Sequence, residues 1–128
     1  MKICVTSQGK DLSSEVDPRF GRCKYFIFVD SDSLEFEAVE NLNAQFSGGA
    51  GIQSGQFMAS KGVKAILTGN IGPNAFGTLQ AAKIEVFTGA SGNVKDVIEK
   101  YKKGKLISTQ GPSVGSKFGM PGKDDKTK

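Results

Sequence analysis

Cys23 lies among positive charges: Arg19, Arg22 and Lys24 accompany it within the segment Asp-Pro-Arg-Phe-Gly-Arg-Cys-Lys at residues 17–24. Nearby cations favour the thiolate, which is the form of cysteine that binds metals or attacks electrophiles. One sulfur cannot complete a tetrahedral metal site by itself, and the chain has no C-x-x-C pair. Cys23 is therefore a candidate metal ligand. The alternative is a partly buried residue at the start of a strand.

Glycine-containing turns provide a second chemistry, the binding of anions by backbone N–H groups. The apolar run at 65–67 is followed by Thr-Gly-Asn-Ile-Gly-Pro, and Pro73 suits the first turn of a helix. Such a strand-to-helix turn presents free N–H groups and a positive dipole end at the carboxyl edge of a sheet, where ligands of open α/β sheets bind. We expect the turns at 48–51 and 89–92, and the loop at 7–22, to lie at the same edge. The alternative for any single glycine is an ordinary turn or cap.

These two features define the candidate site for an anionic ligand. The predicted binding residues, with Cys23 as the metal ligand, are Arg19, Arg22, Cys23, Lys24, Gly48, Gly49, Ala50, Gly51, Gly69, Asn70, Ile71, Gly72 and Pro73.

The composition argues against catalysis. The chain has no histidine, which removes Ser-His-Asp and Cys-His catalysis and imidazole metal sites. None of the 13 acidic residues falls within 63–76, so the convergent carboxylates of a two-metal nuclease are not indicated. The glycines around Gly51 depart from G-x-G-x-x-G, and no phosphate loop of the G-x-x-x-x-G-K-[ST] type is present. The net charge of +4 is typical of a solvated surface rather than of a nucleic-acid-binding patch.

The hydrophobic pattern predicts the elements that position this site. Strands are expected at 2–6, 24–30, 34–41, 65–67 and 85–88, and helices at 52–61, 73–83 and 94–101.

This order predicts a mixed sheet with helices on both faces, a three-layer α/β/α domain. Right-handed crossovers place the first and fourth strands side by side at its centre. The second strand is expected inside the sheet, and the third at an edge guarded by acidic residues. Residues 1–110 form one domain, and residues 111–128 are expected to be a flexible tail. No apolar run reaches the ~20 residues of a membrane span, which favours a cytoplasmic protein.

Three motifs in order resemble the dinitrogenase iron–molybdenum cofactor biosynthesis family, the NifX/NafY-like domain. They are the segment at 17–23 with the strand that follows it, Gly-Gly-Ala-Gly at 48–51, and Thr-Gly-Asn-Ile-Gly-Pro-Asn-Ala-Phe at 68–76. The tail at 111–119 extends the likeness. The resemblance implies a ribonuclease-H-like fold with a five-stranded mixed sheet and an antiparallel second strand. It also implies non-catalytic binding of iron–sulfur or iron–molybdenum clusters or their precursors, which pass between assembly proteins.

The chain departs from the family at positions where members often carry histidine, and where this sequence has residues such as Arg19 and Lys117. Ligation by imidazole is thereby excluded. We expect a carrier for an anionic metal–sulfur cluster, with cofactor-assembly proteins as partners, no nucleic acid or membrane partner, and a monomer or weak homodimer. The alternative is a regulatory or binding module that holds a nucleotide, a phosphate or a partner-protein loop at its glycine-rich edge.

Overall fold

The computed structural model describes residues 1–42 and 50–111, and these form five strands and three helices in the predicted order. The elements are β1 Lys2–Ser7, β2 Tyr25–Asp30, β3 Phe36–Glu40, α1 Ala50–Ser60, β4 Ala65–Leu67, α2 Pro73–Ala81, β5 Glu85–Phe87 and α3 Val94–Lys102. The third strand starts later than expected, because Leu34 takes a left-handed turn conformation with φ 65°. No helix among these residues is long and apolar enough to cross a bilayer.

The strands form one mixed sheet in the order β3-β2-β1-β4-β5. β2 runs antiparallel to both β1 and β3, whereas β4 is parallel to both β1 and β5. β1, β3, β4 and β5 therefore point in the same direction. The adjacency of β1 and β4, the interior position of β2 and the edge position of β3 are confirmed. β1 lies at the centre of the sheet, and its residues from Ile3 onward are buried.

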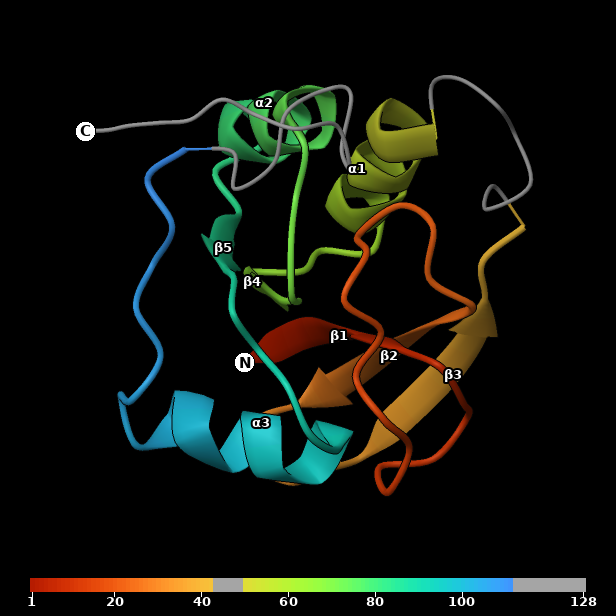
Figure 1. Cartoon of the computed structure of the whole chain (residues 1–128), viewed down its shortest axis with the longest axis vertical. Coiled ribbons are helices and arrows are strands. Elements are labelled where there is room, and N and C mark those ends of the chain that lie inside the picture. Colours follow the sequence, from red (N-terminus) through yellow and green to blue (C-terminus); the bar gives the residue numbers. More distant parts are fainter. Residues whose placement is uncertain (43–49, 112–128) are drawn as a thin grey trace, which may run out of the picture.

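Helices cover both faces of the sheet, which confirms the three-layer arrangement. α1 and α2 lie on one face and α3 lies on the other (Figure 1). Alternate strand residues divide between the two cores, as expected for a sheet that is buried on both faces. Cys4, Phe26, Phe28, Ile66 and Val86 face α1 and α2, and Ile3, Val5, Ile27, Leu67 and Phe87 face α3.

The buried face of α1 differs from the predicted one. Met58 and Gly55 are buried as expected, but Ile52 is 39% exposed and Ala59 is also exposed. The helix is rotated so that Gly55 meets α2: a Cβ on Gly55 would lie 2.7 Å from Thr78 Cγ2. Close backbone approach to α2, rather than the position of the largest side chain, therefore decides which face of α1 is buried.

The ends of the remaining helices follow local signals. Pro73 occupies the first turn of α2, as predicted, but the helix ends at Ala81, and Ala82 is exposed rather than packed. Asn93 caps α3, since its side-chain oxygen accepts a 2.8 Å hydrogen bond from Asp96 N. The segment after α3 runs along β5, where Thr109 N donates to Val86 O at 2.7 Å. Except for Gly111, the tail expected at 111–128 lies outside the described residues.

Candidate functional site

Three of the four predicted loops meet at the carboxyl edge of the sheet. Because β1, β4 and β5 are parallel, the segments that follow them leave the sheet on the same side. Hydrogen bonds join them: Asn70 N donates to Pro18 O at 2.7 Å, and Gly89 N donates to Gly69 O at 2.8 Å. The fourth loop follows β3 from the same edge. Its Gly48 and Gly49 lie outside the described residues, while Ala50 and Gly51 begin α1.

The buried side chain of Asp17 fixes the loop at residues 17–24, which we call the basic loop. This residue is 1% exposed, and its Oδ1 accepts hydrogen bonds from Arg19 N at 3.1 Å and Arg19 Nε at 3.3 Å. Thr6 Oγ1 donates to the Asp17 carbonyl at 2.6 Å. The Arg19 side chain is 52% exposed, but its guanidinium pairs with Asp17. Arg19 therefore neutralises a residue of its own loop, and its charge is only in part available to a ligand, contrary to the sequence expectation.

Asp17 was missed as a site residue, although the sequence contained a signal for it. An aspartate side chain commonly bonds the backbone N–H two residues further on, and the Asp-Pro-Arg sequence has that spacing.

Gly69 and Asn70 serve contacts within the protein rather than an open ligand surface. A Cβ on Gly69 would lie 2.7 Å from Pro18 Cα and 3.0 Å from Pro18 O, so only glycine lets the two loops close together. The N–H of Asn70 is used by Pro18. Ile71 is 1% exposed and belongs to the core between the sheet and α2. These three residues therefore build the edge of the sheet.

Gly72 and Pro73 form the open part of this turn. Gly72 precedes α2 as its N-cap and makes no side-chain cap bond, and the space where its Cβ would lie is free. Pro73 is exposed. The N-terminus of α2 is therefore presented at the carboxyl edge, as the sequence predicted.

Cys23 is buried, and its ionisation is the reverse of the expected one. Burial, together with the smaller effect of the nearby negative charge of Asp17, raises the pKa of the Cys23 thiol to about 12. Arg22 and Lys24 are exposed, whereas the residue between them is buried. The prediction that these cations favour the thiolate is wrong, because the sulfur lies in the protein interior whereas the Arg22 and Lys24 side chains are exposed.

Asn41 is a second residue that the sequence analysis missed. Its Nδ2 donates to Cys23 O at 2.9 Å and to Gly21 O at 3.1 Å, and it lies 3.9 Å from Cys23 Sγ. This buried amide holds the basic loop closed over the sulfur. No sequence motif signals the contact, since the two segments meet only in the folded chain.

We expect both thiols of the native protein to react very slowly with iodoacetamide. The pKa of Cys23 is about 12 instead of the ordinary 9.0, so its thiolate population at neutral pH falls about 1,000-fold. Burial also raises the pKa of Cys4 well above its ordinary value. Because these raised values belong to the folded state, they stabilise it below pH 9, and the stabilisation is lost as the pH rises toward 12. Mass spectrometry after timed labelling measures the reactivity.

Urea denaturation between pH 7 and 11 measures the accompanying change in the free energy of unfolding. Cys23→Ala provides the control, because it should lose less stability than the parent protein over that pH range. Rapid labelling of native Cys23 would contradict the buried position of its sulfur.

The described residues contain no group of three or more cysteine or carboxylate side chains placed to hold a metal ion. Among the described residues of this edge, Arg22 and Lys24 are exposed cations, and Gly72 and Pro73 form the open start of α2. The structure is a three-layer α/β protein whose glycine-containing rim carries exposed arginine and lysine side chains.

This chain belongs to the dinitrogenase iron–molybdenum cofactor family, whose model matches residues 1–104. It is similar to the orange protein of Desulfovibrio gigas, solved in its apo form: the identity is 38%, the TM-score is 0.85, and the match covers 88% of this chain and 95% of that one. A Thermotoga protein of the DUF35 family is 40% identical with a TM-score of 0.73, over 84% of this chain and 91% of that one. An uncharacterized Methanocaldococcus jannaschii protein is 32% identical over 83% of this chain and 89% of its own length.

Proposed function

We propose that this protein is a non-catalytic carrier of an anionic metal–sulfur cluster, of the iron–sulfur or iron–molybdenum type, which it exchanges with cofactor-assembly proteins. The observation that carries the proposal is the exposure of Arg22 and Lys24 on a loop at the carboxyl edge of the sheet, in a chain of the dinitrogenase iron–molybdenum cofactor family. The Desulfovibrio gigas relative was solved in its apo form, the term for a protein without its ligand. We also propose that the fold of this protein is ribonuclease-H-like and that the protein is cytoplasmic.

The cluster is held mainly by charge and by backbone donors. Arg22 and Lys24 are exposed on the loop before β2, and their positive charges favour an anion. The start of α2 at Gly72 and Pro73 adds a positive dipole end and N–H groups without side-chain partners. The start of α1 follows a loop from the same edge of the sheet. Gly69, Asn70 and Ile71 shape the rim through contacts within the protein.

Cys23 is the candidate for a direct bond to metal, and this bond requires a change in the loop. The sulfur is buried under the amide of Asn41, so ligation demands that residues 21–24 turn outward and that the thiol lose its proton. We therefore expect retention by charge to dominate. Cys4 supplies a matched control, since it is an equally buried thiol in the same core.

Anaerobic reconstitution with iron, sulfide and molybdate tests the proposal, with bound metal and the visible absorption spectrum as readouts. We expect the native protein to retain a chromophore, and retention to weaken as salt is added, because salt screens exposed charges. Replacing both Arg22 and Lys24 by glutamine should weaken retention several-fold. The same charge change at Lys100 and Lys102, which are exposed on α3 across the sheet, should have little effect.

Each outcome of this experiment has a definite meaning. No uptake by the native protein would overturn the carrier function. Loss of uptake in Cys23→Ala but not in Cys4→Ala would show that the thiol ligates the metal. A thermal shift with phosphate or nucleotides, without metal uptake, would instead support a binding module that holds an anion at the same rim.

A further inference from the structure

We propose that β3 is a docking edge at which an extended, basic segment of a partner protein adds a strand to the sheet. The opposite edge is already covered, because Thr109 N donates to Val86 O at 2.7 Å and Ser108 pairs with Phe87. Within residues 1–42 and 50–111, no strand lies on the outer side of β3. An uncovered edge strand is a ready template for another extended chain.

The register of β3 shows which backbone groups face outward. Asp30 N donates to Glu35 O, and Asn41 N donates to Lys24 O, both at 2.9 Å. Residue pairs of an antiparallel ladder alternate between bonded and non-bonded, so Glu37 and Val39 also bond to β2.

The intervening residues Phe36, Ala38 and Glu40 consequently direct their N–H and C=O groups away from the sheet. A strand added at this edge would pair with these three residues. Hydrogen bonds to the β3 backbone would then supply affinity, and the side chains on the two faces of β3 would supply selectivity.

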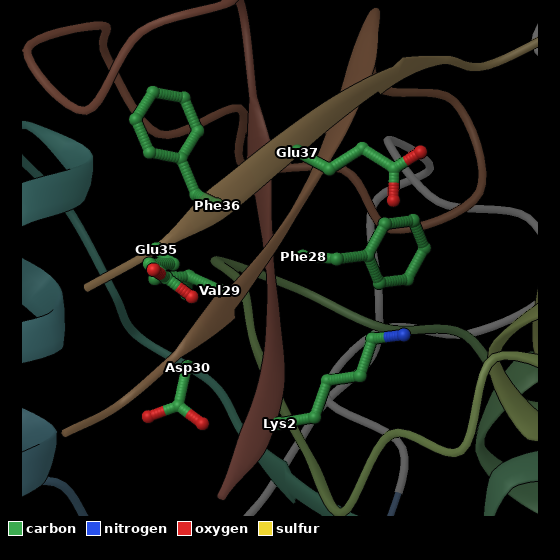
Figure 2. Close-up of a pocket in the computed structure, with 7 residues that line it drawn as sticks. All are labelled: Lys2, Phe28, Val29, Asp30, Glu35, Phe36 and Glu37. Carbon is green, nitrogen blue, oxygen red and sulfur yellow. The ribbon is translucent and has the colours of Figure 1, made fainter. Parts of the chain in front are cut away.

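The side chains beside this edge provide an apolar contact. A cavity of about 280 Å³ opens at the start of β3, lined in part by Val29, Glu35, Phe36 and Glu37. Figure 2 shows Phe36 and Glu37 extending to opposite sides of β3, with Phe28 and Lys2 on the side of Glu37. The Phe36 side chain is 44% exposed. An apolar residue of an incoming strand would cover this ring.

Charge identifies the occupant as basic. Glu35, Glu37 and Glu40 are all exposed on or beside β3, although the whole chain carries a net charge of +4. Lys61 pairs with Glu37 at 3.3 Å and leaves the strand acidic on balance. Opposite charges across neighbouring strands stabilise pairing, and like charges oppose it. A lysine-bearing or arginine-bearing segment therefore fits this edge better than a second copy of β3.

Titration of the ¹⁵N-labelled full chain with an end-blocked Lys-Val-Lys-Val-Lys-Val peptide tests the proposal. We expect the amide shifts to concentrate on residues 35–40, and the matched Glu-Val-Glu-Val-Glu-Val peptide not to bind. Ala38→Pro removes an outward-facing N–H and leaves the hydrogen bonds between β3 and β2 intact. An edge strand tolerates proline at such a position. The substitution should weaken binding about tenfold, because one hydrogen bond is lost and the proline ring blocks the approach.

A charge-reversed variant keeps the test decisive if Ala38→Pro folds poorly. Glu35→Lys combined with Glu40→Lys should lose the basic peptide and gain the acidic one. Shifts scattered over the surface, or equal binding by the Ala38→Pro variant, would overturn the proposal. So would concentration-dependent dimerisation of the parent protein that Ala38→Pro abolishes, since the occupant would then be a second copy. This test is independent of the carrier function, because it uses no metal and probes β3 rather than the residues proposed to hold the cluster.

Discussion

Gly69→Ala is expected to destabilise the protein by about 3 kcal/mol, near the upper end of the range for overpacking substitutions. The added methyl group would lie 2.7 Å from Pro18 Cα and 3.0 Å from Pro18 O, and a backbone neighbour cannot move away as a flexible side chain can. The loop must therefore separate from the turn, which breaks the 2.7 Å hydrogen bond from Asn70 N to Pro18 O. Urea denaturation measures the change in the free energy of unfolding.

Gly72→Ala is the matched control for this change, three residues along the same turn. Nothing lies within 4 Å of a Cβ at Gly72, and its φ of −88° suits any residue. We expect its stability to stay within about 1 kcal/mol of the parent protein. Equal destabilisation by the two substitutions would show that the close approach of Pro18 does not decide the requirement for glycine at position 69.

Asp17→Ala should destabilise the protein by about 2 kcal/mol, because it removes a buried carboxylate that orders the basic loop. Three hydrogen bonds from Arg19 to this carboxylate are lost. The ion-pair contribution is reduced because the Arg19 side chain is half exposed to solvent, so most of the effect comes from the bond to Arg19 N. Asp17→Asn keeps an oxygen acceptor for that bond and should lose less stability.

The thiol of Cys23 reports separately on the charge of Asp17. Asp17→Asn removes a negative charge that helps to raise the pKa of Cys23, so labelling of this thiol should become faster than in the parent protein. Asp11→Asn, an exposed change in the same segment before β2, controls for the change in net charge. An Asp17→Asn protein with unchanged stability and unchanged labelling would contradict the role of this carboxylate.

The elements of the fold could be predicted because their signals are local. The five consecutive apolar or aromatic residues at 25–29 and the spacing of Val94, Val97 and Ile98 identify a strand and a helix without knowledge of their partners. The positions of α1 side chains were harder to predict. Burial of Gly55 against Thr78 rotated the helix and exposed Ile52, and no pattern within α1 contains that information.

In the candidate site too, features with local signals could be predicted, whereas contacts that form only in the folded chain could not. The meeting of the glycine turns could be predicted, since parallel strands end at one edge of a sheet. The orientation of Cys23 could not, because proximity to Arg22 and Lys24 in sequence does not say which side chain points inward. The contact between Asn41 and Cys23 joins segments that are distant along the chain.

The sequence by itself determined the order of the elements, the adjacency of β1 and β4, the edge position of β3 and the family. Apolar periodicity and motifs can be recognised within short segments of the sequence, and the handedness of crossovers follows a general rule. Only the tertiary structure decided that the Asp17 carboxylate is buried, that Pro18 requires Gly69, and that the sulfur of Cys23 is protonated and covered. These properties depend on packing and local dielectric, which arise when the loops before β2 and after β4 are brought together.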